Sequence, residues 1–254
     1  MNSILIITIA VVIFALAFDF INGFHDTANA IATSVSTRAL KPRVAVLLAA
    51  SMNFVGALTF VGVAKAIAND IVDPMSLNAF EGDMTGSVVI LAALLSAITW
   101  NLLTWYFGIP SSSSHTLIGS IAGAAIGAAG ISILNYGGFS KIITALIVSP
   151  ILALSVGFIV MSLFKVLFKN LSLYKTNSRF RLLQIGTAAL QAFTHGTNDA
   201  QKAMGIITMA LIAGGLQSTD EVQGWVRFAC ALAMGLGTSV GGYKIIKTVG
   251  GKIM

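Results

Sequence analysis

The chain has 254 residues, of which 56% are hydrophobic and only 9% carry a charged side chain. Because about a quarter of the residues in a soluble domain are charged, this composition excludes a water-soluble domain and predicts an all-α polytopic membrane protein. The net charge of +6 comes from basic residues in short connections, a pattern typical of cytoplasmic loops rather than of a nucleic-acid-binding surface.

Seven apolar blocks follow one another along the chain. No lysine or arginine precedes Arg38, so the first block lacks the basic start of a signal peptide and is predicted to be a retained membrane helix. Basic connections are placed in the cytoplasm and acidic ones outside, which makes each block cross the membrane once. The blocks are 3–37, 44–67, 85–107, 110–130, 141–168, 181–215 and 225–246.

The blocks 3–37 and 181–215 are too long for one crossing. A helix of about 35 residues is about 50 Å long, whereas the hydrocarbon core of a bilayer is about 30 Å thick. Each block has glycine and polar residues near its middle, so we expect a broken or re-entrant helix in each. Non-helical backbone is tolerated at membrane depth where it lines a protected cavity, so the breaks are predicted to lie at a binding site.

The two expected breaks carry the same motif. Residues 23–32 read GFHDTANAIA and residues 196–205 read GTNDAQKAMG, and both fit G-x-[HN]-D-x-x-[NK]-A. Asp26 and Asp199 are separated by five predicted crossings, so the second copy is expected to run in the opposite direction. Such an inverted-topology repeat places a site near the bilayer midplane, between its two halves.

Three acidic residues, Asp19, Asp26 and Asp199, lie inside apolar blocks. An aspartate at the centre of a membrane helix costs about 2.5–3.5 kcal/mol, so it is retained where it serves a site or has a partner. For the repeated aspartates, the structural alternative is a capping role or an ion pair with Lys202.

Neutral oxygen ligands flank both repeated aspartates. Such ligands suit hard cations, and carboxylates would repel an oxyanion unless a cation lay between them. The pattern therefore predicts coupled uptake of an anion and a cation, with no cofactor and no resident metal. The flanking residues are Thr27, Asn29, Thr197 and Asn198.

All three histidines occur in polar islands, His25 and His195 beside the motif and His115 after a serine run. Histidine can relay protons near neutral pH, and the structural alternative is a neutral side chain that holds backbone in place. His25 is the preferred relay candidate because it adjoins Asp26.

The segment PSSSSH at 110–115 precedes a helical pattern. A helix N-terminus presents free N–H groups and the positive end of the helix dipole, and the hydroxyls add donors, so the segment is a candidate oxyanion cradle. Ordinary N-capping is the structural alternative. Gly119, Gly123 and Gly127, spaced four apart, predict close helix packing.

These motifs resemble the inorganic phosphate transporter (PiT) family. The resemblance rests on residues 23–30, 196–203 and 110–115, and INGFHDTANAIAT and TWYFGIPSSSSHTLIG are similar to its bacterial, low-affinity, proton-linked branch. It implies symport of inorganic phosphate with H⁺ or Na⁺ across a bacterial cytoplasmic (inner) membrane. A divalent metal–phosphate complex as cargo and a homodimer as the assembly stay open.

The resemblance also implies roles for individual residues. Asp26, Asn29, Asn198 and Asp199 would build the cation site, and phosphate would be held by Ser112, Ser113 and Ser114 together with Thr27, Asn29 and Thr197. The first repeat would be 1–168, followed by a basic cytoplasmic loop at 169–180 and the second repeat at 181–254. The family's second proline–serine–histidine element is absent here, so the second repeat is expected to be incomplete.

Two other functions stay under consideration. Hydroxyl groups and helix ends accept any tetrahedral anion, so a transporter of arsenate or sulfate is the first alternative. The second is an intramembrane serine hydrolase that uses Ser114 or a neighbouring serine, His115 and an aspartate. Adjacent residues on a helix point about 100° apart and no G-x-S-x-G turn is present, so enzymatic activity is not predicted.

Overall fold

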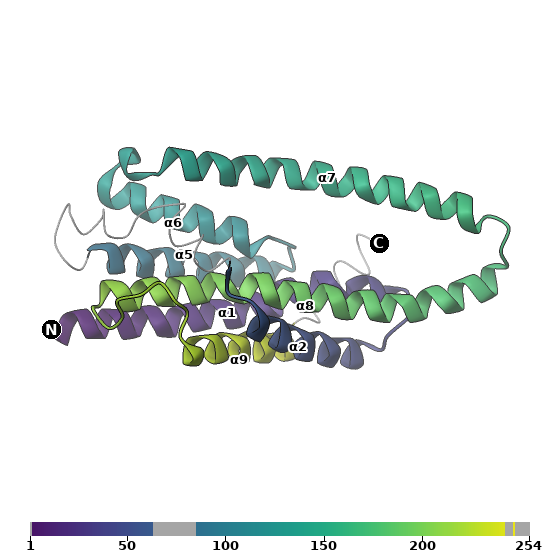
Figure 1. Cartoon of the computed structure of the whole chain (residues 1–254), viewed down its shortest axis with the longest axis horizontal. Coiled ribbons are helices and arrows are strands. Elements are labelled where there is room, and N and C mark those ends of the chain that lie inside the picture. The colour runs from purple at the N-terminus through teal and green to yellow at the C-terminus, as the bar shows by residue number, and fades with distance from the viewer. Residues whose placement is uncertain (1, 63–84, 242–245, 247–254) are drawn as a thin grey trace.

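The computed structural model describes residues 2–62, 85–241 and 246, and this part of the chain is helical with no strand (Figure 1). The all-α prediction is therefore confirmed. The predicted acidic segment around 70–83 and the end of the chain lie outside the described residues. The helices are α1 (Asn2–Ser36), α2 (Pro42–Thr59), α5 (Thr85–Phe107), α6 (Ser113–Ala129), the short 3₁₀ helix η1 (Ile131–Ile133), α7 (Tyr136–Phe168), α8 (Leu173–Ala213) and α9 (Gly224–Gly241).

Several of these helices are long and apolar enough to cross a membrane. The stretches that meet both conditions are Ser3–Ser36, Pro42–Thr59, Gly86–Phe107 and Tyr136–Phe168, and Gly224–Val240 is a shorter apolar helix. Most of the predicted blocks thus correspond to helices. The predicted loop 169–180 is wrong beyond its first residues, because α8 begins at Leu173. Leucine, lysine and arginine are good helix formers, so the basic segment extends α8 instead of ending it.

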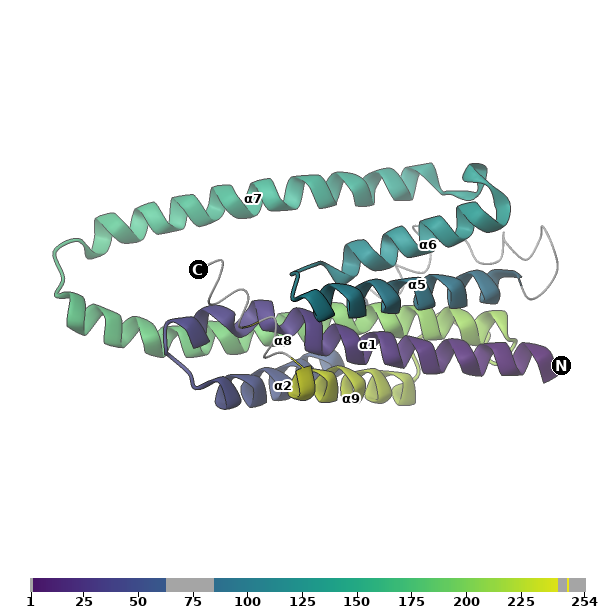
Figure 2. The same ribbon diagram turned by 180° about the vertical axis from the view of Figure 1, so that it is seen from behind.

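The breaks expected within the two long blocks are not present, since α1 and α8 are each one continuous helix. The interruption lies instead between α5 and α6. Gly108 has a positive φ of 68° and ends α5, and Pro110 follows it, a combination that stops a helix. The chain then turns back, so α5 and α6 form a hairpin whose turn lies beside the middle of α1 (Figures 1 and 2). The backbone N–H of Ser113 there donates to Asp26.

The two helices that carry the repeated motif run in opposite directions, and so do α2 and α9 (Figure 1). Their backbones approach closely at four glycines, where a Cβ atom would overlap a carbonyl oxygen of the neighbouring helix. The glycine and the carbonyl residue of each contact are Gly23 with Met234, Gly237 with Phe20, Gly196 with Asn53, and Gly56 with Phe193.

These contacts form two equivalent pairs. Phe20 and Gly23 on α1 correspond to residues 193 and 196 on α8, at the same separation as the repeated aspartates. By the same pattern of contacts, though at a different sequence separation, Asn53 and Gly56 on α2 correspond to residues 234 and 237 on α9. An inverted repeat would produce this correspondence, and the repeat remains a prediction that the packing supports.

The close packing predicted for the glycines of α6 is not observed. A Cβ atom at Gly119, Gly123 or Gly127 would have no described atom within 4 Å. Four-residue spacing places these glycines on one face of α6, but the described helices do not pack on that face. The four-residue spacing of glycines thus identifies a helix face without large side chains, but it does not show which helix packs on that face.

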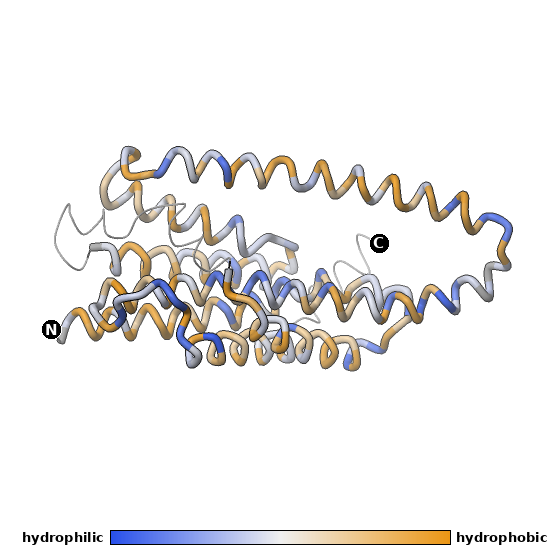
Figure 3. Tube along the Cα trace, viewed as in Figure 1, coloured by the Kyte–Doolittle hydropathy of each residue, from blue (hydrophilic) through white to orange (hydrophobic). Residues whose placement is uncertain are grey.

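The apolar core lies between α1, α5, α8 and α9, where Phe18, Leu94, Met204 and Met234 are fully buried. In a bilayer the alternative surroundings of such side chains are lipid tails, so close packing rather than removal from water stabilises these contacts. In contrast, α7 lies apart from the bundle along most of its length and is largely hydrophobic (Figures 2 and 3). Gly138 is its only buried residue within the described structure.

Candidate functional site

A cavity of about 340 Å³ lies where α1, α8 and the start of α6 meet. Both repeated aspartates line it, and so do the predicted serines 112 and 114, although these groups are far apart in the sequence. The complete lining is Asp26, Asn29, Ala30, Ser111, Ser112, Ser114, Gln191, Thr194, His195, Asn198 and Asp199.

The carboxylate of Asp26 is held by a histidine side chain and a backbone N–H. His25 is fully buried, and its Nδ1 donates to Asp26 Oδ1 over 2.8 Å. The second oxygen, Oδ2, accepts the backbone N–H of Ser113 over 3.2 Å. The other ring nitrogen of His25 lies 3.1 Å from Thr104 Oγ1 and 3.4 Å from Ser111 Oγ, so hydroxyl groups continue the hydrogen-bonded chain from Asp26.

The carboxylate of Asp199 is held by a cation as well as by neutral groups. Lys202 Nζ lies 2.9 Å from Asp199 Oδ2, and Asn22 donates to the same oxygen over 3.1 Å. Lys202 is only 7% exposed, so this is a buried ion pair. The prediction that Lys202 is a charge partner therefore agrees with the geometry, which places the ammonium group on Asp199 and not on Asp26.

His195 presents a nitrogen to the same carboxylate. The Asn53 amide nitrogen donates to the hydroxyls of Thr27 and Thr238, both over 2.8 Å, which leaves Asn53 Oδ1 to accept from His195 Nδ1 over 3.1 Å. His195 Nε2 then faces Asp199 Oδ2 at 3.5 Å. With Nδ1 donating, the lone pair of a neutral ring lies on Nε2, so a cation between Nε2 and the carboxylate would contact both groups.

A cation could be shared across the cavity. One ligand atom from each of Asp26, His195 and Asp199 lies within 4.8 Å of the other two. Carboxylate oxygens and an imidazole nitrogen are ligands for several biological metal ions, and Asn29 and Asn198 in the same cavity wall add oxygens for a harder ion. His195 was predicted as a proton relay, and its place among these ligands was not.

The start of α6 supplies the hydroxyl side of the cavity. Ser112 is the N-cap, and its Oγ accepts the backbone N–H of His115 over 3.4 Å. Ser113 is fully buried, and its hydroxyl accepts from Asn101 over 3.4 Å. Thus Ser113 reaches the site through its backbone N–H to Asp26, whereas Ser112 and Ser114 are among the residues that line the cavity.

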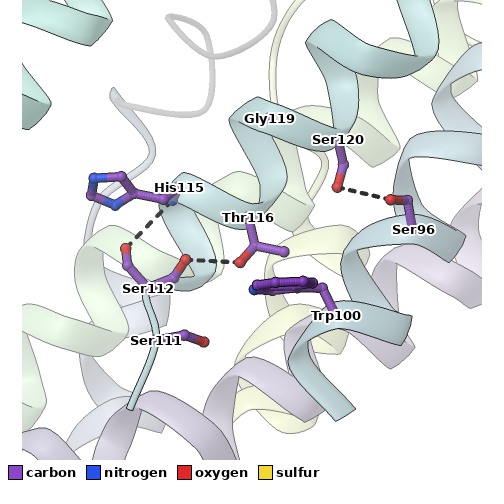
Figure 4. A pocket seen from close by; sticks show the side chains of 8 residues that line it. All are labelled: Ser96, Trp100, Ser111, Ser112, His115, Thr116, Gly119 and Ser120. Carbon is purple, nitrogen blue, oxygen red and sulfur yellow. Dashed lines mark hydrogen bonds between the residues drawn. The ribbon is translucent and has the colours of Figure 1, made fainter. Parts of the chain in front are cut away.

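Three predicted site residues lie elsewhere. Thr27 is buried and bonds Thr238 Oγ1 at 3.0 Å, and Thr197 donates to the backbone carbonyls of Gly56 and Phe193, so both threonines hold helices together and neither lines the cavity. His115 lines a second cavity of about 560 Å³, on the other side of the serine segment, with Trp100 and Thr116 (Figure 4). Helix geometry explains these positions, because neighbouring residues point about 100° apart.

Several polar residues of the site were not predicted. Gln191 and Thr194 line the cavity, and Asn22 and Asn53 orient its charged groups. One signal was available: Asn22 and His195 each precede a repeated aspartate by four residues, a spacing that places them on the same helix face. Asn53 had no such signal, because it reaches the site from another helix.

Comparison with known proteins identifies the chain's relatives. The profile of the phosphate transporter family matches residues 22–175 and 169–254. The chain belongs to the phosphate transporter family. Its resemblance to this family is thereby confirmed.

Members of this family in other bacteria are similar over the whole chain. A probable low-affinity inorganic phosphate transporter of Bacillus subtilis is 69% identical, over 100% of this chain and 75% of that protein. A relative of the same description from Mycobacterium leprae is 46% identical, over 98% of this chain and 59% of its own length. The chain thus spans three quarters of the first relative and about six tenths of the second. These relatives are named for transport, not catalysis.

A solved structure described as the sodium-dependent phosphate transporter shares the fold. It matches with a TM-score of 0.76 over 96% of this chain and 78% of its own length, at 23% sequence identity. Family membership and the apolar helices together make the chain a multi-pass cell-membrane protein, as predicted.

Proposed function

We propose that the chain carries the ion site of a symporter that moves inorganic phosphate together with a cation. The observation that carries the proposal is a single cavity lined by Asp26, Asp199 and the serines 112 and 114. The names of the bacterial relatives give the same cargo.

Charge explains why a cation must accompany the anion. Asp26 and Asp199 bring two negative charges to the cavity, and Lys202 brings one positive charge. A phosphate anion placed beside them adds further negative charge in surroundings of low polarity, where unpaired charges are costly. A cation between the carboxylates and phosphate would remove this repulsion. A metal cation would lie at Asp26, His195 and Asp199, whereas a proton would neutralise one buried carboxylate, and phosphate would lie at the serines in either case.

The related fold described as sodium-dependent makes Na⁺ one candidate, and the hydrogen-bonded histidines make H⁺ the other. A divalent cation carried with phosphate would use the same carboxylate and imidazole ligands. Arsenate has the shape and protonation of phosphate, so it should compete for the site, whereas fully ionised sulfate cannot donate a proton to a carboxylate there.

The serine hydrolase alternative gains no support from the geometry. Ser114 lines the smaller cavity and His115 the larger one. Ser111 and Ser112 line both cavities, but the contact between Ser112 and His115 is a cap on the backbone N–H of His115 and does not involve its ring. The predicted homodimer also has no observation in its favour.

The test is uptake of radiolabelled phosphate into liposomes that contain the purified chain. Accumulation above the outside concentration under an inward H⁺ or Na⁺ gradient, with competition by arsenate, is the expected result. Uptake that ignores both gradients, or equal competition by sulfate, would contradict the proposal. Because the chain spans only part of its relatives, binding of phosphate in detergent should be measured in parallel.

A further inference from the structure

Asp19 is a buried acid that the cavity does not use. It is 0% exposed, and neither carboxylate oxygen has a hydrogen-bond partner among the described residues. It lies three residues before Asn22 and seven before Asp26, so the three share one face of α1. An ionised carboxylate without donors is costly to bury, so Asp19 requires either a proton or a cation.

The charged groups that act on Asp19 come from α8. They are Asp199 and Lys202, the members of the buried ion pair. Asn22 connects the two places, because its amide donates to Asp199 while its own oxygen has no partner among the described residues. Two carboxylates thus lie near one ammonium group.

The other helices that pack on α1 add little charge near Asp19. On α9 the charged or titratable residues are Arg227 and Cys230, and of these only the Cys230 thiol interacts with Asp19. The charged or titratable residues of α2 and α5 are Arg43 and Tyr106, and neither acts on Asp19. Among the described residues of these helices, Lys202 is therefore the one cation that acts on Asp19, and Asp199 already contacts it.

When the two copies of the predicted repeat are compared, Asp19 and Lys202 occupy positions at which the other copy has neutral residues. At the separation that relates Asp26 to Asp199, Asp19 corresponds to Ala192, and Asn29 corresponds to Lys202. Ala192 packs in a core cluster with Ala28 and Ala30, the residues on either side of Asn29. One half of the repeat therefore has alanine near asparagine, where the other half has aspartate near lysine.

We propose that Asp19 binds the coupling proton and that Lys202 is a cation built into the chain, at the position that Asn29 occupies in the first repeat. This proposal rests on the proposed function, and it selects H⁺ as the coupling ion. A proton neutralises Asp19 without a shell of oxygen ligands, whereas a metal cation would need several and would lie near the Lys202 ammonium group. When Asp19 releases its proton to water, Lys202 is the group that can compensate the new carboxylate.

Infrared difference spectroscopy on the chain in lipid tests the protonation directly. The wild-type chain should show the C=O stretch of a protonated carboxyl group that disappears as the pH rises. Asp19→Asn should lack this signal, and the exposed Asp220→Asn should keep it. A wild-type chain without the signal, or Asp19→Asn with an unchanged signal, would overturn the proposal. These spectra need no transport, so they stay decisive even if phosphate uptake is absent and the proposed function fails.

Uptake in liposomes tests the coupling. The wild-type chain should accumulate phosphate under a pH gradient without Na⁺, and Asp19→Asn should bind phosphate but lose this accumulation. Lys202→Asn, which restores the residue of the first repeat, should make uptake respond to Na⁺. The proposal would be overturned if wild-type phosphate uptake followed a Na⁺ gradient and did not depend on pH. It would also be overturned if the Asp19→Asn variant still accumulated phosphate under a pH gradient. Phosphate uptake by Lys202→Arg, which retains the positive charge, should not respond to Na⁺.

Discussion

The motif on α1 and the motif on α8 place an aspartate in the same cavity and compensate its charge in different ways. Asp26 accepts from a buried histidine and from a backbone N–H, and no lysine or arginine among the described residues forms an ion pair with it. Asp199 contacts the ammonium group of Lys202 and lies 3.5 Å from His195. Two copies of one motif therefore form two electrostatic environments.

Because the two aspartates have different partners, the same substitution is expected to affect phosphate binding and the stability of the fold differently in the two motifs. A histidine N–H and a backbone N–H can donate to an amide oxygen as well as to a carboxylate, so the α1 side is expected to tolerate the loss of the aspartate charge. On the α8 side the lysine depends on its aspartate, because an unpaired buried ammonium group is costly. The same substitution in the two motifs should therefore weaken the cargo site in both but destabilise the fold mainly in one.

The largest expected effect comes from Asp26→Asn and Asp199→Asn. Each removes a charged ligand and should weaken phosphate binding by about 10- to 100-fold, the equivalent of a hydrogen bond to a charged group. Asp199→Asn should also lower the free energy of unfolding by about 3–5 kcal/mol, as is typical of a broken buried ion pair. Radiolabelled phosphate binding and thermal unfolding in detergent measure the two effects. Equal thermal stability of both variants would contradict the comparison, and Asp220→Asn is the exposed control.

The next effect concerns the equivalent glycines of the two motifs. Gly23→Ala and Gly196→Ala would each place a methyl group against a carbonyl of the neighbouring helix, which should destabilise the protein by about 1–3 kcal/mol. Thermal unfolding in detergent is the measurement. Gly119→Ala, where the described structure leaves the position open, is the matched control and should not destabilise. A tolerated methyl group at Gly23 alone would show that the two helix contacts are not equivalent.

A smaller effect separates the serines at the start of α6. Ser112→Ala and Ser114→Ala each remove a hydroxyl from the cavity and should weaken phosphate binding by about 1 kcal/mol, or several-fold. Ser113→Ala keeps the backbone N–H that binds Asp26 and should bind phosphate normally. Equilibrium binding measurements on the three variants decide this, and a Ser113→Ala variant weaker than the others would contradict it.

The smallest effect is expected for His115, which lies outside the cavity of the aspartates. His115→Gln should leave phosphate binding unchanged, whereas His25→Gln should weaken it, because His25 is the buried donor to Asp26. Binding isotherms of the two variants at one pH suffice. If His115→Gln abolished binding, phosphate would have to occupy the larger cavity.

Residue chemistry along the chain was sufficient to predict a membrane protein and most of the cavity. Low charge content requires lipid as the solvent, and aspartates retained in apolar segments indicate a site. Asp26, Asn29, Asn198 and Asp199 do line one cavity, and three residues of the serine run, Ser111, Ser112 and Ser114, line it too. Their shared location could be predicted because carboxylates buried in a membrane protein require polar or charged partners.

Only the tertiary structure decided where each neighbouring side chain points. Thr27 and Thr197 lie within the motifs but bond to other helices, and His115 lies on the far side of the serine segment. The breaks predicted in α1 and α8 are replaced by the turn at Gly108, because helix length alone cannot show whether polar residues interrupt a helix or face a partner. Rotation about a helix axis and the choice of packing neighbour depend on contacts between distant segments, which a single sequence does not display.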